Sequence, residues 1–89
     1  MRKIEVITDQ DHLRELLDIF ENHRLDGFTA IEIAHGKGAK QGLTLGLGLS
    51  GSRGIYVFSV CQAATASALE GDLRTFVRRN HGIALISPI

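Results

Sequence analysis

The chain has 89 residues, of which 44% are hydrophobic and 22% charged, and its ten basic and ten acidic side chains give a formal net charge of zero. A chain of this length has material for one hydrophobic core, so we predict a single domain over residues 1–89. The charge balance argues against a general nucleic-acid-binding protein, and the single cysteine, Cys61, excludes an internal disulfide.

The first predicted strand covers Lys3–Thr8, where apolar and polar side chains alternate. Thr8 or Asp9 then offers a side-chain oxygen that can cap a helix. The apolar face of that helix repeats at helical spacing and consists of Leu13, Leu16, Leu17 and Phe20. The other face is expected to be solvated and to carry the carboxylates of Asp9, Asp11, Glu15, Asp18 and Glu21.

Gly27 is expected to form a turn with positive φ before a second strand at roughly Phe28–Ala34. A flexible loop, about residues 35–53, follows and begins His35-Gly36-Lys37-Gly38-Ala39-Lys40-Gln41-Gly42. Glycines let the backbone approach a ligand closely, and Lys37 and Lys40 suit a phosphate or a carboxylate. We therefore place the functional region at this junction, although a plain connecting loop would have the same composition.

The leucines at every second position of Leu43–Leu49 have two interpretations. They can extend the hairpin as a β-ribbon, or they can dock on a partner when an effector orders the loop.

The second half of the chain repeats the alternation of strand and helix. A third strand is predicted over Gly54–Cys61 and a second helix over about Ala63–Arg79, which Gly82 ends before a last strand at Ile83–Ile89. The order βαββαβ with right-handed crossovers predicts an α+β, ferredoxin-like fold, in which a four-stranded antiparallel sheet has both helices on one face.

The predicted strands are apolar on both faces. In the third strand, Ile55, Val57 and Cys61 point one way, while Tyr56, Phe58 and Val60 point the other way. Two helices cover only one face of such a sheet, so we predict a homo-oligomer that packs through its sheets.

The most specific motif is Gly27-Phe28-Thr29 at the start of the second strand, with Glu32 three residues on. Gly36-Lys37-Gly38 and Gln41-Gly42 follow in the loop. In this order and placement, the whole chain resembles the PII-like signalling proteins. The resemblance implies a non-enzymatic homotrimer that binds an adenine nucleotide or small anionic effector between subunits. Its long loop, the T-loop of that family, would control a membrane transporter or a metabolic enzyme.

The resemblance also implies roles for individual residues. The base or ribose would be contacted from one subunit by Gly27, Phe28 and Thr29. Phosphates or an effector would be bound at the base of the loop by Gly36, Lys37, Gly38, Lys40 and Gln41. Further positive charge would come from Arg53, Arg78 and Arg79. Alternatively, Gly27 and Thr29 are ordinary turn and strand residues, Arg53 is a solvated charge, and the two last arginines complement the helix dipole.

Two departures from the family pattern bear on the ligand. The connection Arg78–Gly82 lacks the Thr-Gly…Gly-Asp-Gly loop that wraps the nucleotide phosphates, and the sequence stops at Ile89, before the family's C-terminal arginines. Tight ATP binding is therefore not expected, and AMP, ADP, ATP, cyclic AMP and bicarbonate all stay open as effectors. The single tyrosine, Tyr56, falls in a strand, so covalent modification of a loop tyrosine is not expected either.

Two related classes share the fold and remain alternatives: a CutA-type metal-binding trimer and an ACT-like small-molecule-binding module. A metal site is not expected, because no ligand spacing is formed by His12, His23, His35 and His81. Of these, His35 lies beside the loop. We expect no required cofactor, no catalytic group and no membrane insertion, and the lack of a signal peptide predicts a cytoplasmic protein.

Overall fold

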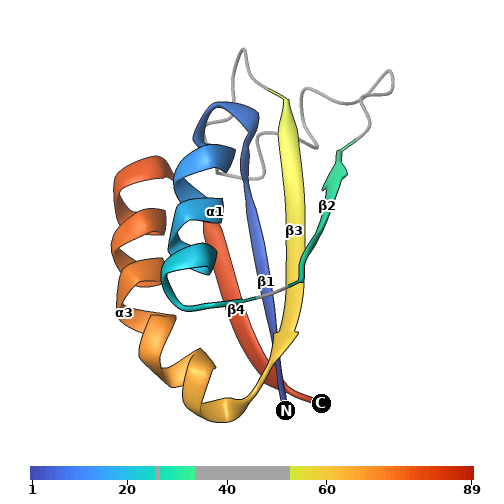
Figure 1. Cartoon of the computed structure of the whole chain (residues 1–89). Coiled ribbons are helices and arrows are strands. Elements are labelled where there is room, and N and C mark those ends of the chain that lie inside the picture. Colours follow the sequence, from blue (N-terminus) through green and yellow to red (C-terminus); the bar gives the residue numbers. More distant parts are fainter. Residues whose placement is uncertain (26, 34–52) are drawn as a thin grey trace.

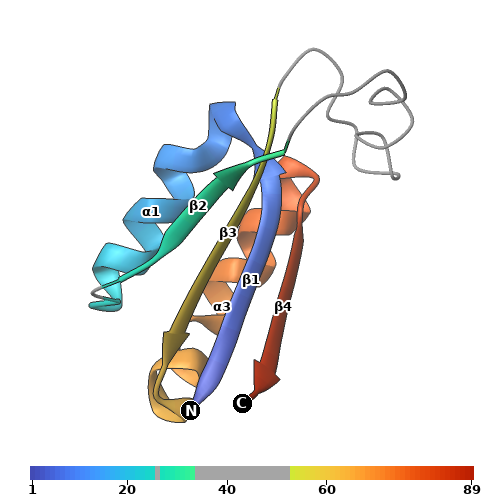
Figure 2. The same cartoon turned by 90° about the vertical axis from the view of Figure 1, so that its right-hand side faces the viewer.

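The computed structural model describes residues 1–25, 27–33 and 53–89 (Figure 1). In chain order, its elements are β1 (Arg2–Asp9), the 3-10 turn η1 (Gln10–His12), α1 (Leu13–Asn22), β2 (Thr29–Glu32), β3 (Gly54–Cys61), α3 (Ala63–Asn80) and β4 (Ile83–Pro88). In the described part of the chain, the strands form one antiparallel sheet in the order β2-β3-β1-β4. Both helices lie on the same face of that sheet (Figure 2). The predicted ferredoxin-like α+β fold is confirmed.

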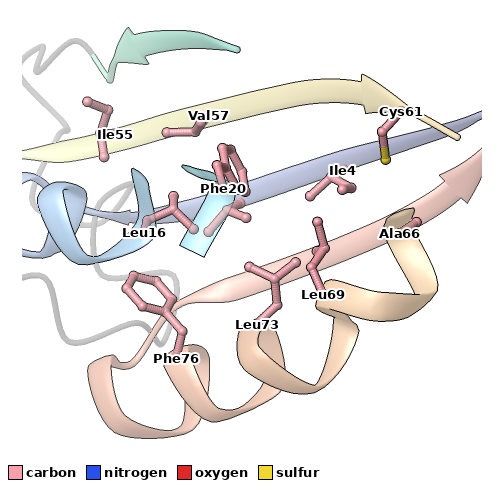
Figure 3. Close-up of a cluster of buried hydrophobic side chains, with 11 residues drawn as sticks. Ile4, Leu16, Phe20, Ile55, Val57, Cys61, Ala66, Leu69, Leu73 and Phe76 are labelled. Atoms are coloured by element: carbon pink, nitrogen blue, oxygen red, sulfur yellow. The ribbon is translucent and has the colours of Figure 1, made fainter. Parts of the chain in front are cut away.

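The core lies between the sheet and the two helices (Figure 3). The inward positions of β1 and β3 meet one face of each helix, and the buried apolar side chains are Ile4, Val6, Leu16, Phe20, Ile55, Val57, Cys61, Ala66, Leu69, Leu73 and Phe76. Fully burying a large apolar side chain contributes roughly 1.5–3 kcal/mol relative to leaving it exposed. This layer therefore fixes where both helices sit and which side of the sheet remains uncovered.

The start of α1 differs from the prediction at Asp9. Its carboxylate accepts a hydrogen bond from the His12 backbone N–H at 3.1 Å and contacts the His12 ring nitrogen Nδ1 at 2.5 Å. Asp9 is 7% exposed, so the expectation that it lies on a solvated helix face was wrong. Its oxygen instead caps the 3-10 turn that precedes the helix, which confirms the expected capping role.

The turn before β2 also differs from the prediction. Arg24, with φ 59°, adopts the left-handed conformation, and the φ of Gly27 lies outside that region. The Arg24 N–H donates to the Glu21 carbonyl at 3.0 Å and the Leu25 N–H to the Phe20 carbonyl at 2.9 Å. The chain thus turns immediately after α1, and Gly27 lies two residues before the start of β2. β2 itself begins at Thr29, one residue later than predicted.

A close approach of backbones joins α3 to β4. His81, with φ 53°, ends α3, and only His81 and Gly82 separate the helix from the strand. A Cβ atom at Gly82 would lie 2.8 Å from the Ile7 carbonyl oxygen. The helix therefore ends at His81 rather than by the predicted action of Gly82, whose lack of a side chain lets the chain pass close to β1.

Among the described residues, no element covers the face of the sheet opposite the helices, here called the open face, which is apolar at several positions. Its exposed large side chains are Ile31, Val60, Ile83 and Leu85, at 50%, 46%, 38% and 58%. The inward positions Val57 and Ser59 of β3 are buried, whereas Val60 is not. The prediction of two apolar faces is confirmed, and the homo-oligomer that would cover the second face stays a prediction.

Candidate functional site

The predicted site residues within the described part of the chain lie in three places. Gly27 and Phe28 precede β2 and Thr29 begins it, Arg53 lies directly before β3, and Arg78 and Arg79 are in the last turn of α3. The other five predicted residues lie outside the described residues: Gly36, Lys37, Gly38, Lys40 and Gln41. The interpretations of Leu43–Leu49 and His35 lie outside them as well.

Gly27 is anchored by a hydrogen bond to β3. The hydroxyl of Ser59, which is 3% exposed, donates to the Gly27 carbonyl oxygen. A Cβ atom at Gly27 would meet nothing within 4 Å. The backbone is thus held in place while the space beside it is open, which is the arrangement that a ligand or a neighbouring subunit needs for close approach.

A surface groove of about 310 Å³ lies next to Gly27. Its polar side chains come from the turn after α1 and from the first turn of α3, and they are Arg24, Gln62 and Thr65. A guanidinium, an amide and a hydroxyl together can bind an anionic or polar group. Sequence reasoning missed these three residues because they share no motif and only the fold brings them together.

Phe28 and Thr29 point to opposite sides of the sheet. The Phe28 ring lies 6.3 Å from the Phe20 ring, centroid to centroid, and so packs toward the helix side. Thr29 pairs with Phe58 of β3, and directly paired residues share a face, so Thr29 lies on the open side. One molecule bound on the open face can therefore reach Thr29, whereas the Phe28 side chain lies on the helix side and is 46% exposed there.

Arg53 lies at the other end of β2. Its Nη1 donates to Oε1 of Glu32 at 2.7 Å, and its carbonyl accepts from the Gln10 N–H at 2.8 Å. The Arg53 side chain is 66% exposed. The backbone is therefore fixed to the end of β1, while the guanidinium is accessible to an anion that can compete with Glu32.

The two arginines in the last turn of α3, Arg78 and Arg79, differ in their surroundings. Nη2 of Arg79 donates to the Glu15 carboxylate across the helix layer, and the Asn80 amide contacts the same oxygen at 3.4 Å. Arg78 is exposed beside it. A phosphate could recruit Arg79 only in competition with Glu15.

Gly27 and the arginines lie toward opposite ends of the molecule. The last turn of α3 and the start of β3 lie at the end away from the chain termini (Figure 1). Gly27 instead lines a groove together with Met1 and with Cys61, the last residue of β3. One protomer therefore does not gather the described candidates into a single pocket. A site that uses both groups has to combine residues of neighbouring protomers.

The described residues give no support for a metal site, a reactive thiol or a membrane-spanning helix. No group of three or more His, Cys, Asp and Glu side chains in residues 1–25, 27–33 and 53–89 could hold a metal ion. Burial raises the pKa of the Cys61 thiol, which keeps it neutral. Neither helix of this part of the chain has the length and apolar character to cross a bilayer.

Known structures share this architecture. CPII from Thiomonas intermedia K12, bound to ADP, AMP and acetate, superposes with a TM-score of 0.78 at 16% identity, over 99% of this chain and 84% of that chain. CPII bound to ADP and bicarbonate gives 0.75 at 19% identity, over 99% and 84%. A protein described as PII-like from Thermus thermophilus gives 0.72 at 13% identity, over 97% and 82%. The TM-scores of 0.72–0.78 establish a common fold, and at these low identities they show the fold alone.

The sequence comparisons assign the family. Among curated proteins no sequence matches this chain. The family model of nitrogen regulatory protein P-II, however, matches residues 1–89, the full length of the sequence. With this match and the observed fold, the chain belongs to the nitrogen regulatory protein P-II family.

Proposed function

We propose that this protein is a non-enzymatic PII-like regulator, a homotrimer that binds an adenine nucleotide in the clefts between subunits. The observation that carries the proposal is the placement of Gly27 and Thr29. Both lie on an exposed edge strand or its approach, with open space beside Gly27 and with Thr29 on the uncovered face of the sheet. A neighbouring protomer packed on that face would close a cleft over them. CPII, which has the same fold, has been solved with ADP and AMP bound.

The residues proposed to bind the nucleotide phosphates are expected to bind AMP or ADP more tightly than ATP. Only His81 and Gly82 connect α3 to β4, so this connection cannot wrap a triphosphate with backbone N–H groups. Arg79 already pairs with Glu15, and this pair must open before Arg79 can bind a phosphate. Lys37 and Lys40, at the start of the loop, are the cations proposed to complete the site.

We propose that the loop over about residues 35–53 contacts the target protein and transmits the effect of ligand binding to it. Its two ends are held together by the pair Arg53–Glu32 and by the Ile33 N–H, which donates to the Gly54 carbonyl at 2.9 Å. An effector that competes with Glu32 for Arg53 would act directly at this junction. Such an effector shifts the loop only by its difference in affinity for the two loop states. The target would be a membrane transporter or a metabolic enzyme in the cytoplasm.

Isothermal titration of the purified protein with AMP, ADP, ATP and cyclic AMP, with and without bicarbonate or Mg²⁺, tests the proposal. We expect saturable binding near one nucleotide per chain, with AMP or ADP tighter than ATP. An absence of heat with every nucleotide would contradict it. Binding of a divalent metal alone would favour the CutA-type alternative, and a dimeric molar mass would favour the ACT-like one.

Replacing Gly27 with valine is expected to weaken nucleotide binding roughly tenfold or more, equivalent to about 1.4 kcal/mol. A Cβ atom at this position would meet nothing within 4 Å, so we expect valine to occupy the space proposed for the ligand without disturbing the fold. Lys37→Glu should weaken binding similarly by reversing a charge beside the phosphates. Titration calorimetry checks both variants, with Ala68→Val on the exposed side of α3 as the control. Unchanged affinity in both variants would refute the site assignment.

A further inference from the structure

The open face of the sheet has a polar centre within its apolar surface. Strand pairing places Thr29, Phe58, Glu5 and Leu85 in one row across β2, β3, β1 and β4. Lys3, two residues before Glu5, belongs to the same face. The exposed apolar residues of this face lie on β2, β3 and β4. Lys3 and Glu5 of β1 are therefore charged side chains with apolar residues on both sides of them.

These charges form a defined cluster with the aromatic rings of β3. The Tyr56 hydroxyl donates to Oε2 of Glu5 at 2.7 Å, and Nζ of Lys3 lies 3.9 Å from the same oxygen. Lys3 Nζ also lies 5.2 Å from the centroid of the Phe58 ring, and that ring is tilted against the Tyr56 ring with 5.6 Å between their centroids. The Glu5 carboxylate raises the pKa of Tyr56, because a phenolate beside it would lose the hydrogen bond and face a like charge.

The cluster adds little to the stability of a lone protomer. The Lys3 and Glu5 side chains are 38% and 29% exposed, and ion pairs at such partly solvated positions contribute little because water screens them. The position of the cluster on the open face has a larger effect when another protein surface covers that face. If a second protein surface covers the apolar residues around it, Glu5 loses its water and needs hydrogen-bond donors beyond Tyr56.

We infer that Lys3 of one protomer pairs with Glu5 of the next and thereby sets how neighbouring sheet faces align; this rests on the homotrimer proposed above. The occupant of the face is a second copy of the chain because the face is self-complementary in charge. It carries one cation and one anion beside each other, and in a ring every protomer can offer Lys3 to one neighbour and Glu5 to the other. Misaligned faces would bury both charges against apolar side chains, which is strongly unfavourable.

Charge reversal in separate and mixed samples tests this pairing. We expect K3E and E5K each to raise the dissociation concentration of the assembly roughly tenfold or more in sedimentation velocity. An equimolar mixture of the two variants should assemble better than either alone, because a mixed ring has two matched contacts out of three. Circular dichroism should show both variants folded, since each side chain is partly solvated in the protomer.

The exposed pair Glu70–Arg74 on α3 provides the matched control, because E70R and R74E make the same charge changes away from the open face. These variants should assemble as the wild type does, alone and mixed. If K3E and E5K assemble like the wild type, or if their mixture dissociates like the single variants, the pairing between protomers is wrong while the homotrimer stands. A wild type that stays monomeric overturns the homotrimer itself.

Discussion

Replacing Gly82 with alanine is expected to destabilise the folded protein by about 1–3 kcal/mol, the usual cost of forcing extra atoms into a packed region. The new Cβ would lie 2.8 Å from the carbonyl oxygen of Ile7. That oxygen belongs to β1, which is held between β3 and β4 and cannot move without disturbing the centre of the sheet. The Thr8 Cβ and the Val77 side chain also lie 3.6 Å from the new Cβ, so the alanine cannot shift away from the Ile7 oxygen without meeting them.

Gly71→Ala is the matched control, and its effect should have the opposite sign. Gly71 lies inside α3, where a Cβ would meet nothing within 4 Å, so alanine should stabilise the protein by roughly 0.5–1 kcal/mol through helix propensity. Urea unfolding at one fixed protein concentration measures both changes, because the stability of an oligomer depends on concentration. A Gly82→Ala variant as stable as the wild type would show that β4 does not approach β1 as described.

Replacing Leu85 with lysine is expected to disrupt the assembly while leaving the protomer folded. Leu85 is 58% exposed and lies in the same row of the open face as Glu5 and Phe58, so a lysine there is solvated in the monomer. Covered by a neighbour, its charge would be buried among apolar side chains, and we expect the dissociation concentration to rise about 100-fold, which corresponds to ~2.7 kcal/mol.

Light scattering over a range of protein concentrations measures this loss of mass. Ala68→Lys introduces the same side chain at an exposed position of α3, on the helix layer, and should leave the mass unchanged. If Leu85→Lys assembles as well as the wild type does, the open face of the sheet is not the interface between subunits.

The fold was predictable from residue spacing because β3 and α3 have clear patterns. The alternation in β3 reproduces the buried and exposed sides of that strand, and its bounds, Gly54–Cys61, are as predicted. β2 was harder to delimit. Within the described sheet it is an edge strand whose one partner is β3, and all four of its residues are exposed, so no burial pattern marks where it begins or ends.

Contacts between side chain and backbone were not predictable from composition alone. Asp9 was expected in solvent with the other carboxylates, yet it is buried because it caps a turn that the helical pattern does not indicate. Gly27 was expected to have positive φ, but Arg24 takes that conformation. At Asp9 and at Arg24, local hydrogen bonds determine the conformation. Such hydrogen bonds are harder to predict from a sequence than the regular spacing of apolar residues.

The placement of the candidate residues was predictable only in part. The motif Gly27-Phe28-Thr29 lies where β2 begins, as predicted, but strand alternation already implies that Phe28 and Thr29 face opposite ways, which the motif does not convey. Ser59 anchors Gly27 from β3, and this contact spans 32 residues of sequence. Pairs so distant in sequence can be found only once the strand register is known.

Native mass spectrometry of the wild-type protein with added ADP tests whether it is a nucleotide-binding trimer, because one spectrum gives both the number of chains and the number of bound nucleotides. We expect an assembly of three chains that takes up as many as three ADP molecules, with fewer bound to the Gly27→Val variant. A monomer, or a trimer that binds no nucleotide at saturating ADP, would contradict it.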